Sequence, residues 1–200
     1  MTQPPPAYPR MRIGLMGGTF NPAHDGHRHI AVEALKRLRL HQVWWIVTPQ
    51  NPLKSAGAAS NFNARLASAR AAARHPRIVV TAFEASLSST YTLETLSFLR
   101  RRAPGARFVW IMGADNLAGF HRWRGWRALM RLMPIAVFDR PGWRRRALSS
   151  PAAVAFRSAQ AAESRAAALP GSAPPRWVFV SQPPIAISST ALREQTLRRG

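Results

Sequence analysis

The sequence contains no cysteine, few acidic residues and no long apolar run. Without cysteine the chain has no disulfide, no thiolate metal ligand and no thiol nucleophile. No uninterrupted apolar stretch approaches the roughly 20 residues of a membrane-spanning helix. Residues 1–10 hold four prolines in place of the apolar core of a secretory signal. We therefore expect a cytoplasmic protein without a membrane partner.

Acidic side chains are scarce, with 8 against 29 basic ones, and the net charge is +21. A basic surface attracts polyanions of any sequence. The arginines are nevertheless spread over most of the chain, and no nucleic-acid-binding motif is visible. No two acidic residues are spaced to form a carboxylate cage, so we expect no metal site built by the protein. The charge is interpreted as background that favours anionic substrates, with no specific nucleic-acid partner.

Short apolar runs alternate with stretches of helical spacing over residues 11–200. The runs lie at 13–16, 43–47, 78–80, 108–112, 135–138 and 177–180, and the helical stretches at 30–38, 62–74, 93–102 and 126–132. Continuous apolar strands that alternate with helices are typical of a parallel sheet covered on both faces. We predict a single α/β domain with a Rossmann-like, doubly wound parallel sheet of five or six strands. Such sheets bind ligands beyond the carboxyl ends of their strands.

Two segments depart from this pattern. Residues 1–10 are rich in proline, which supports neither ladders nor helices, and are predicted to be a disordered tail. Residues 149–175 are rich in Ala, Ser and Pro. Within them, residues 151–168 fit a surface helix that Ser149 or Ser150 opens and that ends near residues 170–171.

The segment GGTFNPAHDGH, residues 17–27, follows the first apolar run and leads into a helix. A strand, a glycine turn and a helix start are where α/β proteins hold phosphates. Glycines let N–H groups approach the anion, and the helix N-terminus adds partial positive charge. His24 and His27 flank the helix start, and we expect both at the loop surface. Two imidazoles beside a phosphate suit a reaction in which negative charge grows on phosphoryl oxygens.

Five further motifs follow in order. They are TPQNPLK (48–54), STYTLETL (89–96), GADNL (113–117) with Trp123 and Trp126 after it, DRPG (139–142) and ISSTALR (187–193). Thr92 is a plausible helix N-cap, and Glu94 is expected to point outward. Asp115 fits a helix N-cap. The hydroxyls and Arg193 of the last motif suit a second phosphate site at a helix start.

These motifs resemble those of the HxGH nucleotidyltransferase superfamily, and within it the bacterial nicotinate-nucleotide adenylyltransferase family. The resemblance spans about residues 12–193. Two departures are visible. Asn21 stands where the superfamily pattern GTFDPxHxGH has Asp, so it suits the turn before Pro22 but supplies no carboxylate. The chain also ends at Gly200, sooner after ISSTxxR than such relatives usually end.

The resemblance implies an adenylyltransferase of NAD biosynthesis that condenses ATP with nicotinate mononucleotide to nicotinate adenine dinucleotide and pyrophosphate. His24 and His27 would be the catalytic residues. The implied ATP-binding residues are Gly17, Gly18, Thr19, Phe20, His24, His27, Ser188, Ser189, Thr190 and Arg193. The implied acceptor-binding residues are Lys54, Tyr91, Thr92, Asp115 and Trp123. As the alternative to a helix N-cap, Asp115 would bind ribose hydroxyls or other polar groups of the nucleotide. The resemblance implies no protein metal ligand, and Mg²⁺ would arrive with ATP, held by phosphate oxygens and water.

Two other functions stay open on the sequence alone. A nicotinamide-mononucleotide or pantetheine-phosphate adenylyltransferase would share the histidine loop, although STYTxxTL and the Trp123/Trp126 pair argue against the pantetheine-phosphate enzyme. A basic nucleic-acid-binding module on a degenerate enzyme fold belongs to a different class. Absence of HExxH, a Walker loop and GxGxxG disfavours a metalloprotease, a P-loop ATPase and a dinucleotide-holding protein. Oligomeric state has no signature in the sequence.

Overall fold

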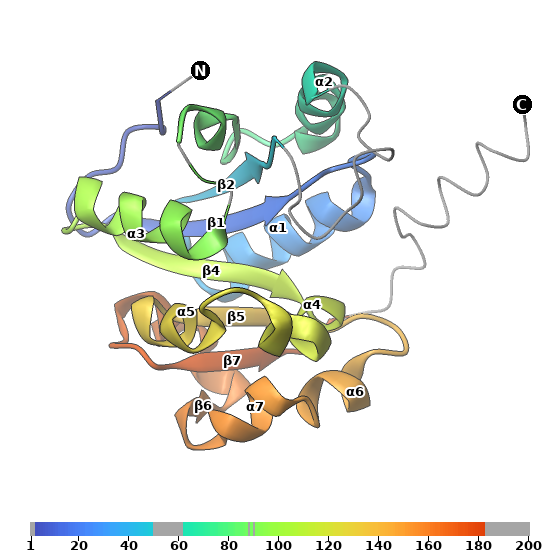
Figure 1. Cartoon of the computed structure of the whole chain (residues 1–200), viewed down its shortest axis with the longest axis vertical. Helices are drawn as coiled ribbons and strands as arrows, with labels where there is room; N and C mark the ends of the chain where they lie inside the picture. The colour runs from blue at the N-terminus through green and yellow to red at the C-terminus, as the bar shows by residue number, and fades with distance from the viewer. Residues whose placement is uncertain (1–2, 50–61, 88, 90, 183–200) are drawn as a thin grey trace, which may run out of the picture.

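The computed structural model describes residues 3–49, 62–87, 89 and 91–182, and strands alternate with helices along them (Figure 1). The strands are β1 (Arg12–Gly18), β2 (Gln42–Val47), β3 (Ile78–Thr81), β4 (Arg107–Gly113), β5 (Ile135–Phe138), β6 (Gln160–Ala161) and β7 (Trp177–Val180). The α-helices are α1 (Asp25–Arg37), α2 (Phe62–Ala73), α3 (Thr92–Arg102), α4 (Ala114–Gly119), α5 (Trp126–Leu132), α6 (Arg144–Leu148) and α7 (Pro151–Ala155). The 3-10 helices are η2 (Phe83–Ser86), η3 (Phe120–Arg122), η4 (Arg157–Ala159) and η5 (Glu163–Gly171).

The described strands form one parallel sheet of seven strands in the order β3-β2-β1-β4-β5-β7-β6. All six strands predicted from apolar runs are present. The predicted total of five or six is wrong by one strand, β6, whose two residues pair with the first two of β7. A two-residue edge strand is too short to produce an apolar run, so nothing in the sequence pattern marks it.

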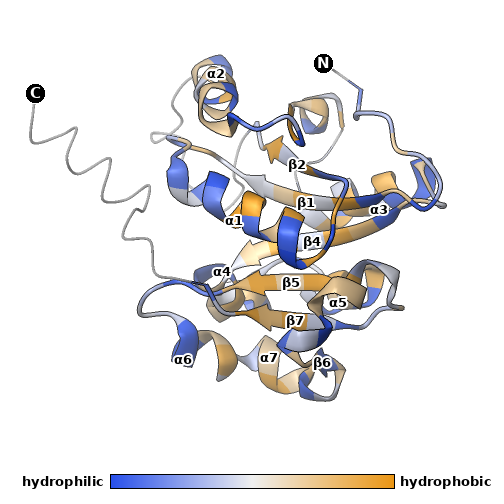
Figure 2. Ribbon diagram, turned by 180° about the vertical axis from the view of Figure 1, so that it is seen from behind, coloured by the Kyte–Doolittle hydropathy of each residue, from blue (hydrophilic) through white to orange (hydrophobic). Residues whose placement is uncertain are grey.

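Helices cover both faces of the sheet, as a doubly wound fold requires. One face packs against α3, α4, α5 and α7, with Leu96, Leu117 and Leu129 in the interface. The other face packs against α1, α2 and η5, with Leu35 and Leu169 among the buried residues. The two layers are visible from opposite sides in Figures 1 and 2, and apolar colour concentrates on the strands in Figure 2.

Glycines in β1 make room for side chains of neighbouring elements. A Cβ at Gly14 would lie 2.4 Å from Ile111 Cδ1, and one at Gly17 would lie 2.6 Å from the Trp110 ring. Gly17 and Gly18 are the last two residues of β1, so the turn itself begins at Thr19. Gly17 is therefore required by packing against a core indole.

The helix predicted over residues 151–168 is broken into α7, η4, β6 and η5. Its predicted start is confirmed, because Ser150 Oγ accepts the Ala153 N–H at 3.3 Å. The helix stops where the Trp177 indole N–H donates to the Phe156 carbonyl at 2.8 Å, occupying a helix acceptor. The segment lies at the surface with one buried side, because alanines such as Ala152 and Ala166 face the core while residues such as Arg157 and Arg165 are exposed.

Residues 3–10 contain neither helix nor strand, yet their last residues contact the domain. Ala7 packs against the core, and the Arg10 N–H donates to the Gly105 carbonyl at 2.8 Å. The predicted disorder therefore does not extend to residues 7–10, where an apolar contact and a backbone hydrogen bond hold the chain.

Candidate active site

The predicted phosphate loop lies where the sheet reverses its winding. From β1 the chain passes through α1 to β2 on one side, whereas β4 pairs with β1 on its other side. In open α/β sheets the crevice at such a switch point, beyond the carboxyl ends of the strands, is the ligand site. Residues 19–27 leave β1 and residues 114–117 leave β4 at this edge.

His24 and His27 form a reciprocal cap at the start of α1. The Gly26 N–H donates to His24 Nδ1 at 3.1 Å, and the His24 N–H donates to His27 Nδ1 at 3.3 Å. Their ring centroids are 3.9 Å apart. His24 is only 5% exposed, so the predicted surface position is wrong for it. A capping role draws the ring back over the first helical turn, which buries it.

The two hydrogen bonds assign the tautomers. Because Nδ1 of each ring accepts an N–H, the proton of each neutral imidazole resides on Nε2. His24 Nε2 is buried and has no partner among the described residues. Buried polar atoms are nearly always hydrogen-bonded, so an orphan donor at a sheet switch point indicates a ligand atom in the functional state.

Burial keeps both rings neutral. Desolvation, aided by the positive charge of Arg140, lowers the pKa of His24 from 6.5 to about 4. Desolvation, then the neighbouring His24 and Arg140, lowers the pKa of His27 to about 3. At neutral pH the pair therefore offers two uncharged Nε2–H donors. A bound anion would favour the protonated rings and raise both pKa values.

Phe20 shapes the floor of the loop. It has φ 46°, in the left-handed region that a bulky residue rarely adopts. Its ring is 2% exposed, stacks on Trp45 with centroids 5.0 Å apart, and lies 5.0 Å from the His27 ring. The predicted ATP-binding residue Phe20 thus has its side chain committed to the core, which leaves its backbone to face a ligand.

Asp115 lies in the first turn of α4, whose N-cap is Gly113, so the N-cap interpretation of Asp115 is wrong. Its Oδ2 accepts from Arg140 Nη1 at 2.8 Å. Its Oδ1 is buried without a partner within the described part of the chain. Because Arg140 also lowers the pKa of both histidines, this ion pair belongs to the histidine site.

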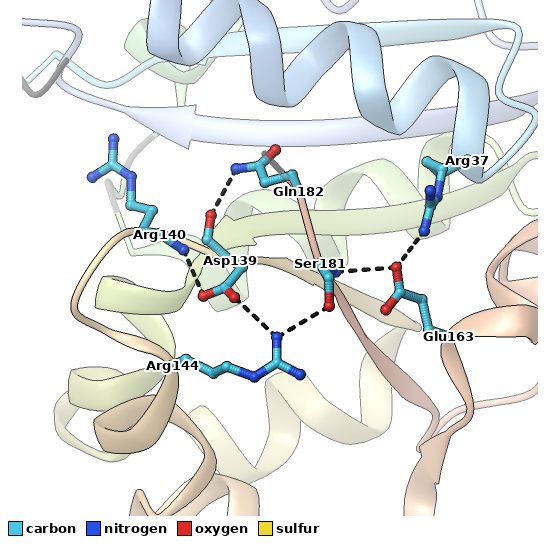
Figure 3. A network of polar contacts seen from close by, with 7 residues as sticks. All are labelled: Arg37, Asp139, Arg140, Arg144, Glu163, Ser181 and Gln182. Atoms are coloured by element: carbon cyan, nitrogen blue, oxygen red, sulfur yellow. Dashed lines mark hydrogen bonds and ion pairs between the residues drawn. The ribbon is translucent and has the colours of Figure 1, made fainter. Parts of the chain in front are cut away.

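A polar network holds the DRPG turn against the end of β7 (Figure 3). The Asp139 carboxylate accepts the Arg140 N–H at 2.8 Å and Arg144 Nη1 at 3.0 Å. Arg144 Nη1 also donates to Ser181 Oγ at 3.0 Å. The turn that carries Arg140 is therefore tied directly to the first residue after β7.

The same network fixes the chain on the other side of β7. The Ser181 N–H donates to Glu163 Oε1 at 3.1 Å, and Glu163 is ion-paired with Arg37 at the end of α1. Gln182 Nε2 donates to the Asp139 carbonyl at 2.6 Å. Elements α1, η5 and β5 thereby converge on the residues that lead toward the ISSTALR motif (Figure 3).

A cation–π contact joins the STYTLETL motif to the segment that follows the GADNL motif. The Arg124 guanidinium lies 4.5 Å from the centroid of the Tyr91 ring. Thr92 is the first residue of α3 and Tyr91 is its N-cap, so the prediction of Thr92 as N-cap is wrong. Glu94 is exposed on α3, as expected. The segments 89–96 and 113–126 thus share one side of the molecule.

Trp123 and Trp126 do not lie on one helix. Trp123 follows η3 and is partly buried, with its ring 5.2 Å from Phe120 and 6.4 Å from Trp110. Trp126 begins α5 and is 9% exposed in the core. Only Trp123 keeps a partly exposed indole, so it alone of the pair is available to a ligand.

The predicted residues Lys54, Ser188, Ser189, Thr190 and Arg193 lie outside the described residues.

Two buried charged residues near the site were absent from the sequence predictions. Arg65 of α2 donates to carbonyls of both loops that leave β1 and β2. Glu84 of η2 accepts from Thr95 Oγ1 at 2.6 Å, and burial raises its pKa. The one available signal for Arg65 is its place beside Leu66, Ala69 and Ala73 on the buried side of an alanine-rich helix.

Comparison of the chain with known proteins identifies the family to which it belongs. The cytidylyltransferase-like family model matches residues 15–195. A probable nicotinate-nucleotide adenylyltransferase of Methylorubrum extorquens is 54% identical over 183 residues, which cover 92% of this chain and 99% of that protein. The chain belongs to the nicotinate-nucleotide adenylyltransferase family. The recognition of this nucleotidyltransferase family from six ordered motifs is confirmed.

Other matches agree with this family. A probable nicotinate-nucleotide adenylyltransferase of Cereibacter sphaeroides is 52% identical over 190 residues, 95% of this chain and 100% of that protein. The fold matches the Plasmodium falciparum nicotinic acid mononucleotide adenylyltransferase complexed with NaAD. That match has a TM-score of 0.70 at 15% identity, with 92% of this chain and 83% of that chain covered. At this identity the match supports the fold alone.

The described residues offer neither a metal cluster nor a membrane span. No group of three or more His, Asp or Glu side chains among them could hold a metal ion. No helix of that part of the chain is long and apolar enough to cross a membrane.

Proposed function

We propose that the chain transfers the adenylyl group of ATP to nicotinate mononucleotide, yielding nicotinate adenine dinucleotide and pyrophosphate. The observation that carries the proposal is the pair of buried, neutral histidines at the sheet switch point. Both direct their protons from Nε2, and His24 Nε2 lacks a partner among the described residues. Relatives more than half identical carry the name of this activity over nearly the whole chain.

The chemistry is an in-line displacement at the α-phosphorus of ATP. An oxygen of the acceptor phosphate forms the new P–O bond while the bond to the bridging oxygen of pyrophosphate breaks. Nucleophile and leaving group both carry charge already, so no proton transfer and no covalent intermediate with the protein are required. Catalysis then rests on positioning and on stabilising charge that develops on phosphoryl oxygens.

The histidine site supplies donors for that charge. His24 and His27 would donate from Nε2 to oxygens of the reacting phosphates, in a buried setting where each hydrogen bond is electrostatically stronger than in water. Arg140 adds a full positive charge nearby and is oriented by Asp115. Mg²⁺ would accompany ATP on its phosphate oxygens and on water.

Acceptor choice is assigned to the surface around Tyr91 and Trp123. The first turn of α3 has no side-chain cap among the described residues, so its N–H groups can reach a ligand, and Arg124 over Tyr91 adds positive charge beside it. These groups favour the carboxylate of nicotinate over the neutral amide of nicotinamide, while Glu94 is exposed. A site built for a hydrogen-bonded group rejects an analogue that leaves its donors poorly satisfied.

The test is pyrophosphate release with each acceptor in turn. We expect kcat/KM for nicotinate mononucleotide to exceed that for nicotinamide mononucleotide by roughly 100-fold or more, and no turnover with phosphopantetheine. Trp123→Ala should raise KM for the acceptor far more than KM for ATP. Trp143→Ala, at an exposed tryptophan that follows the DRPG turn, serves as the control. Equal kcat/KM with both mononucleotides would overturn the proposed specificity for nicotinate mononucleotide. A Trp123 variant impaired only toward ATP would show that the pyridine ring does not bind at Trp123.

A further inference from the structure

Arg65 is a buried arginine that donates hydrogen bonds to three backbone carbonyls. It belongs to α2 and is 5% exposed. Its Nη1 donates to the Thr19 carbonyl at 2.7 Å and the Thr48 carbonyl at 2.8 Å, and its Nη2 donates to the Pro49 carbonyl at 2.5 Å. Burying a guanidinium is costly unless its donors are satisfied, so such a cluster of acceptors holds the side chain firmly.

The three carbonyls belong to two different loops at the site's edge of the sheet. Thr19 follows β1 and begins the histidine loop, whereas Thr48 and Pro49 follow β2 and begin the TPQNPLK motif. The strands are neighbours, and the Thr48 N–H donates to the Gly18 carbonyl at 3.0 Å. Arg65 therefore clamps two neighbouring loops from a third element.

The clamp acts on a peptide with unusual backbone geometry. The Thr19 carbonyl faces Arg65, and a trans peptide is planar, so the Phe20 N–H points away from α2. Phe20 has φ 46°, which a phenylalanine holds only when its surroundings fix it. Two contacts do so here, namely the buried ring stacked on Trp45 and the Arg65 bond to the preceding carbonyl. The same Phe20 ring supports His27 at 5.0 Å.

We propose that Arg65 is a positioning residue for the phosphate-binding loop, acting through the Thr19–Phe20 peptide and the start of the loop after β2. In the described contacts its guanidinium binds backbone carbonyls and lies over the Phe62 ring, and its effect reaches the reacting phosphates through the Phe20 N–H and the His27 ring. The inference rests on the proposed adenylyl transfer, and it adds a residue outside all six sequence motifs.

The experiment compares Arg65→Met, Arg65→Lys and the control Arg70→Met. Met keeps the unbranched apolar stem without donors, and Lys keeps a charge and donors that reach fewer carbonyls. Arg70 is exposed on the same helix. Amide hydrogen exchange of residues 17–21 and of Val47 and Thr48 reports the two loops directly. Steady-state kinetics, measured well below each variant's melting temperature, separates kcat from KM.

For Arg65→Met we expect exchange in both loops to rise at least about fivefold, with exchange in β4 unchanged. We expect kcat to fall roughly 10- to 100-fold, because a misplacement of about 1 Å has that effect, while KM for ATP changes less than kcat. Arg65→Lys should regain part of kcat, and Arg70→Met should match the parent. A lower melting temperature with parental kcat and parental exchange in the loops would overturn the proposal.

The two proposals fail separately. A parent protein without pyrophosphate release for any acceptor would overturn the proposed function, and the exchange measurement would still judge the Arg65 clamp. Turnover by the parent, with Arg65→Met kcat within about twofold of it, would overturn the positioning role alone.

Discussion

At the scale of single residues, His24 carries two functions on two nitrogens. Nδ1 caps α1 by accepting the Gly26 N–H, and Nε2 is the buried donor without a described partner. The two roles can be separated because asparagine is a good N-cap, whereas its shorter side chain cannot place an N–H donor at the position of His24 Nε2. A histidine at a helix N-cap is thus explained by chemistry as well as by helix stability.

His24→Asn should keep the cap and remove the proposed catalytic donor. We expect kcat to fall by roughly two to three powers of ten, with the urea midpoint close to that of the parent. His24→Ala should lose a similar factor in kcat and also about 1 kcal/mol of stability from the missing cap. Pyrophosphate release and urea unfolding measure the two effects. Near-parental kcat in the Asn variant would remove His24 from the chemistry.

Lowered histidine pKa values also make stability depend on pH. In the unfolded chain both imidazoles become protonated near pH 6.5. In the folded chain the pKa is lowered to about 4 for His24 and to about 3 for His27, so protonation requires a lower pH. Depressed folded pKa values mean that this stability is fully present above pH 6.5 and is lost as pH falls toward 4. Urea midpoints should therefore fall between pH 7 and about pH 4.5, and less steeply in His24→Asn. The same dependence of the urea midpoint on pH in parent and His24→Asn would contradict a lowered pKa for His24.

At the scale of elements, Glu84 joins η2 to α3 beneath the acceptor motif. It is 4% exposed, accepts from Thr95 Oγ1 at 2.6 Å, and has a buried Oε2 without a partner in the described chain. Desolvation raises its pKa, and hydrogen bonds from the Thr95 and Thr48 side chains oppose that rise only in part. Burial therefore disfavours the charged carboxylate of Glu84 in the folded chain relative to the unfolded chain.

Glu84→Gln should remove this sensitivity to pH. A raised folded pKa gives stability that is fully present below the unfolded pKa and is lost as pH rises through the folded one. Glutamine stays neutral and keeps an acceptor for Thr95. We expect its stability relative to the parent to improve as pH rises, and that of Glu94→Gln, at an exposed position on α3, to show a much smaller trend. Urea unfolding across the pH range measures it, and a difference independent of pH would sink the idea.

The helices and strands differ in how well the sequence pattern predicts them. Six buried strands are predicted correctly from continuous apolar runs, because parallel strands covered on both faces carry few polar residues. The strand β6 and the break after α7 are not predicted, since an alanine-rich stretch has no pattern that distinguishes a helix from short turns. The Trp177–Phe156 bond that ends the helix is formed between residues distant in the sequence.

The candidate site divides in the same way. His24, His27 and Asp115 belong to local motifs, so the sequence alone is enough to select them as candidates. Arg65 and Glu84 act through contacts with residues 11 to 46 positions away in sequence. Among 27 arginines, the place of Arg65 on the apolar side of an alanine-rich helix does not reveal which carbonyls it binds.

At the scale of the whole molecule, the net charge of +21 bears on both function and specificity. ATP and nicotinate mononucleotide are anions, so a strongly positive protein raises their local concentration at the site and their association rate. Nucleic acid would be attracted by the same field, with an affinity that falls steeply with salt. An enzyme site and a general polyanion surface therefore respond differently when salt rises.

Raising KCl from about 20 mM to about 300 mM shortens the Debye length from roughly 20 Å to roughly 6 Å. We expect kcat/KM for ATP to fall several-fold, because long-range attraction is screened. The value of kcat should change little, because His24 donates from a buried position that salt screens weakly. In a mobility-shift assay at physiological salt, unrelated oligonucleotides should not be retained at concentrations where turnover is saturated. Tight oligonucleotide binding without pyrophosphate release under the same conditions would indicate a nucleic-acid-binding protein that acts through its positive surface rather than an enzyme that acts through the histidine site.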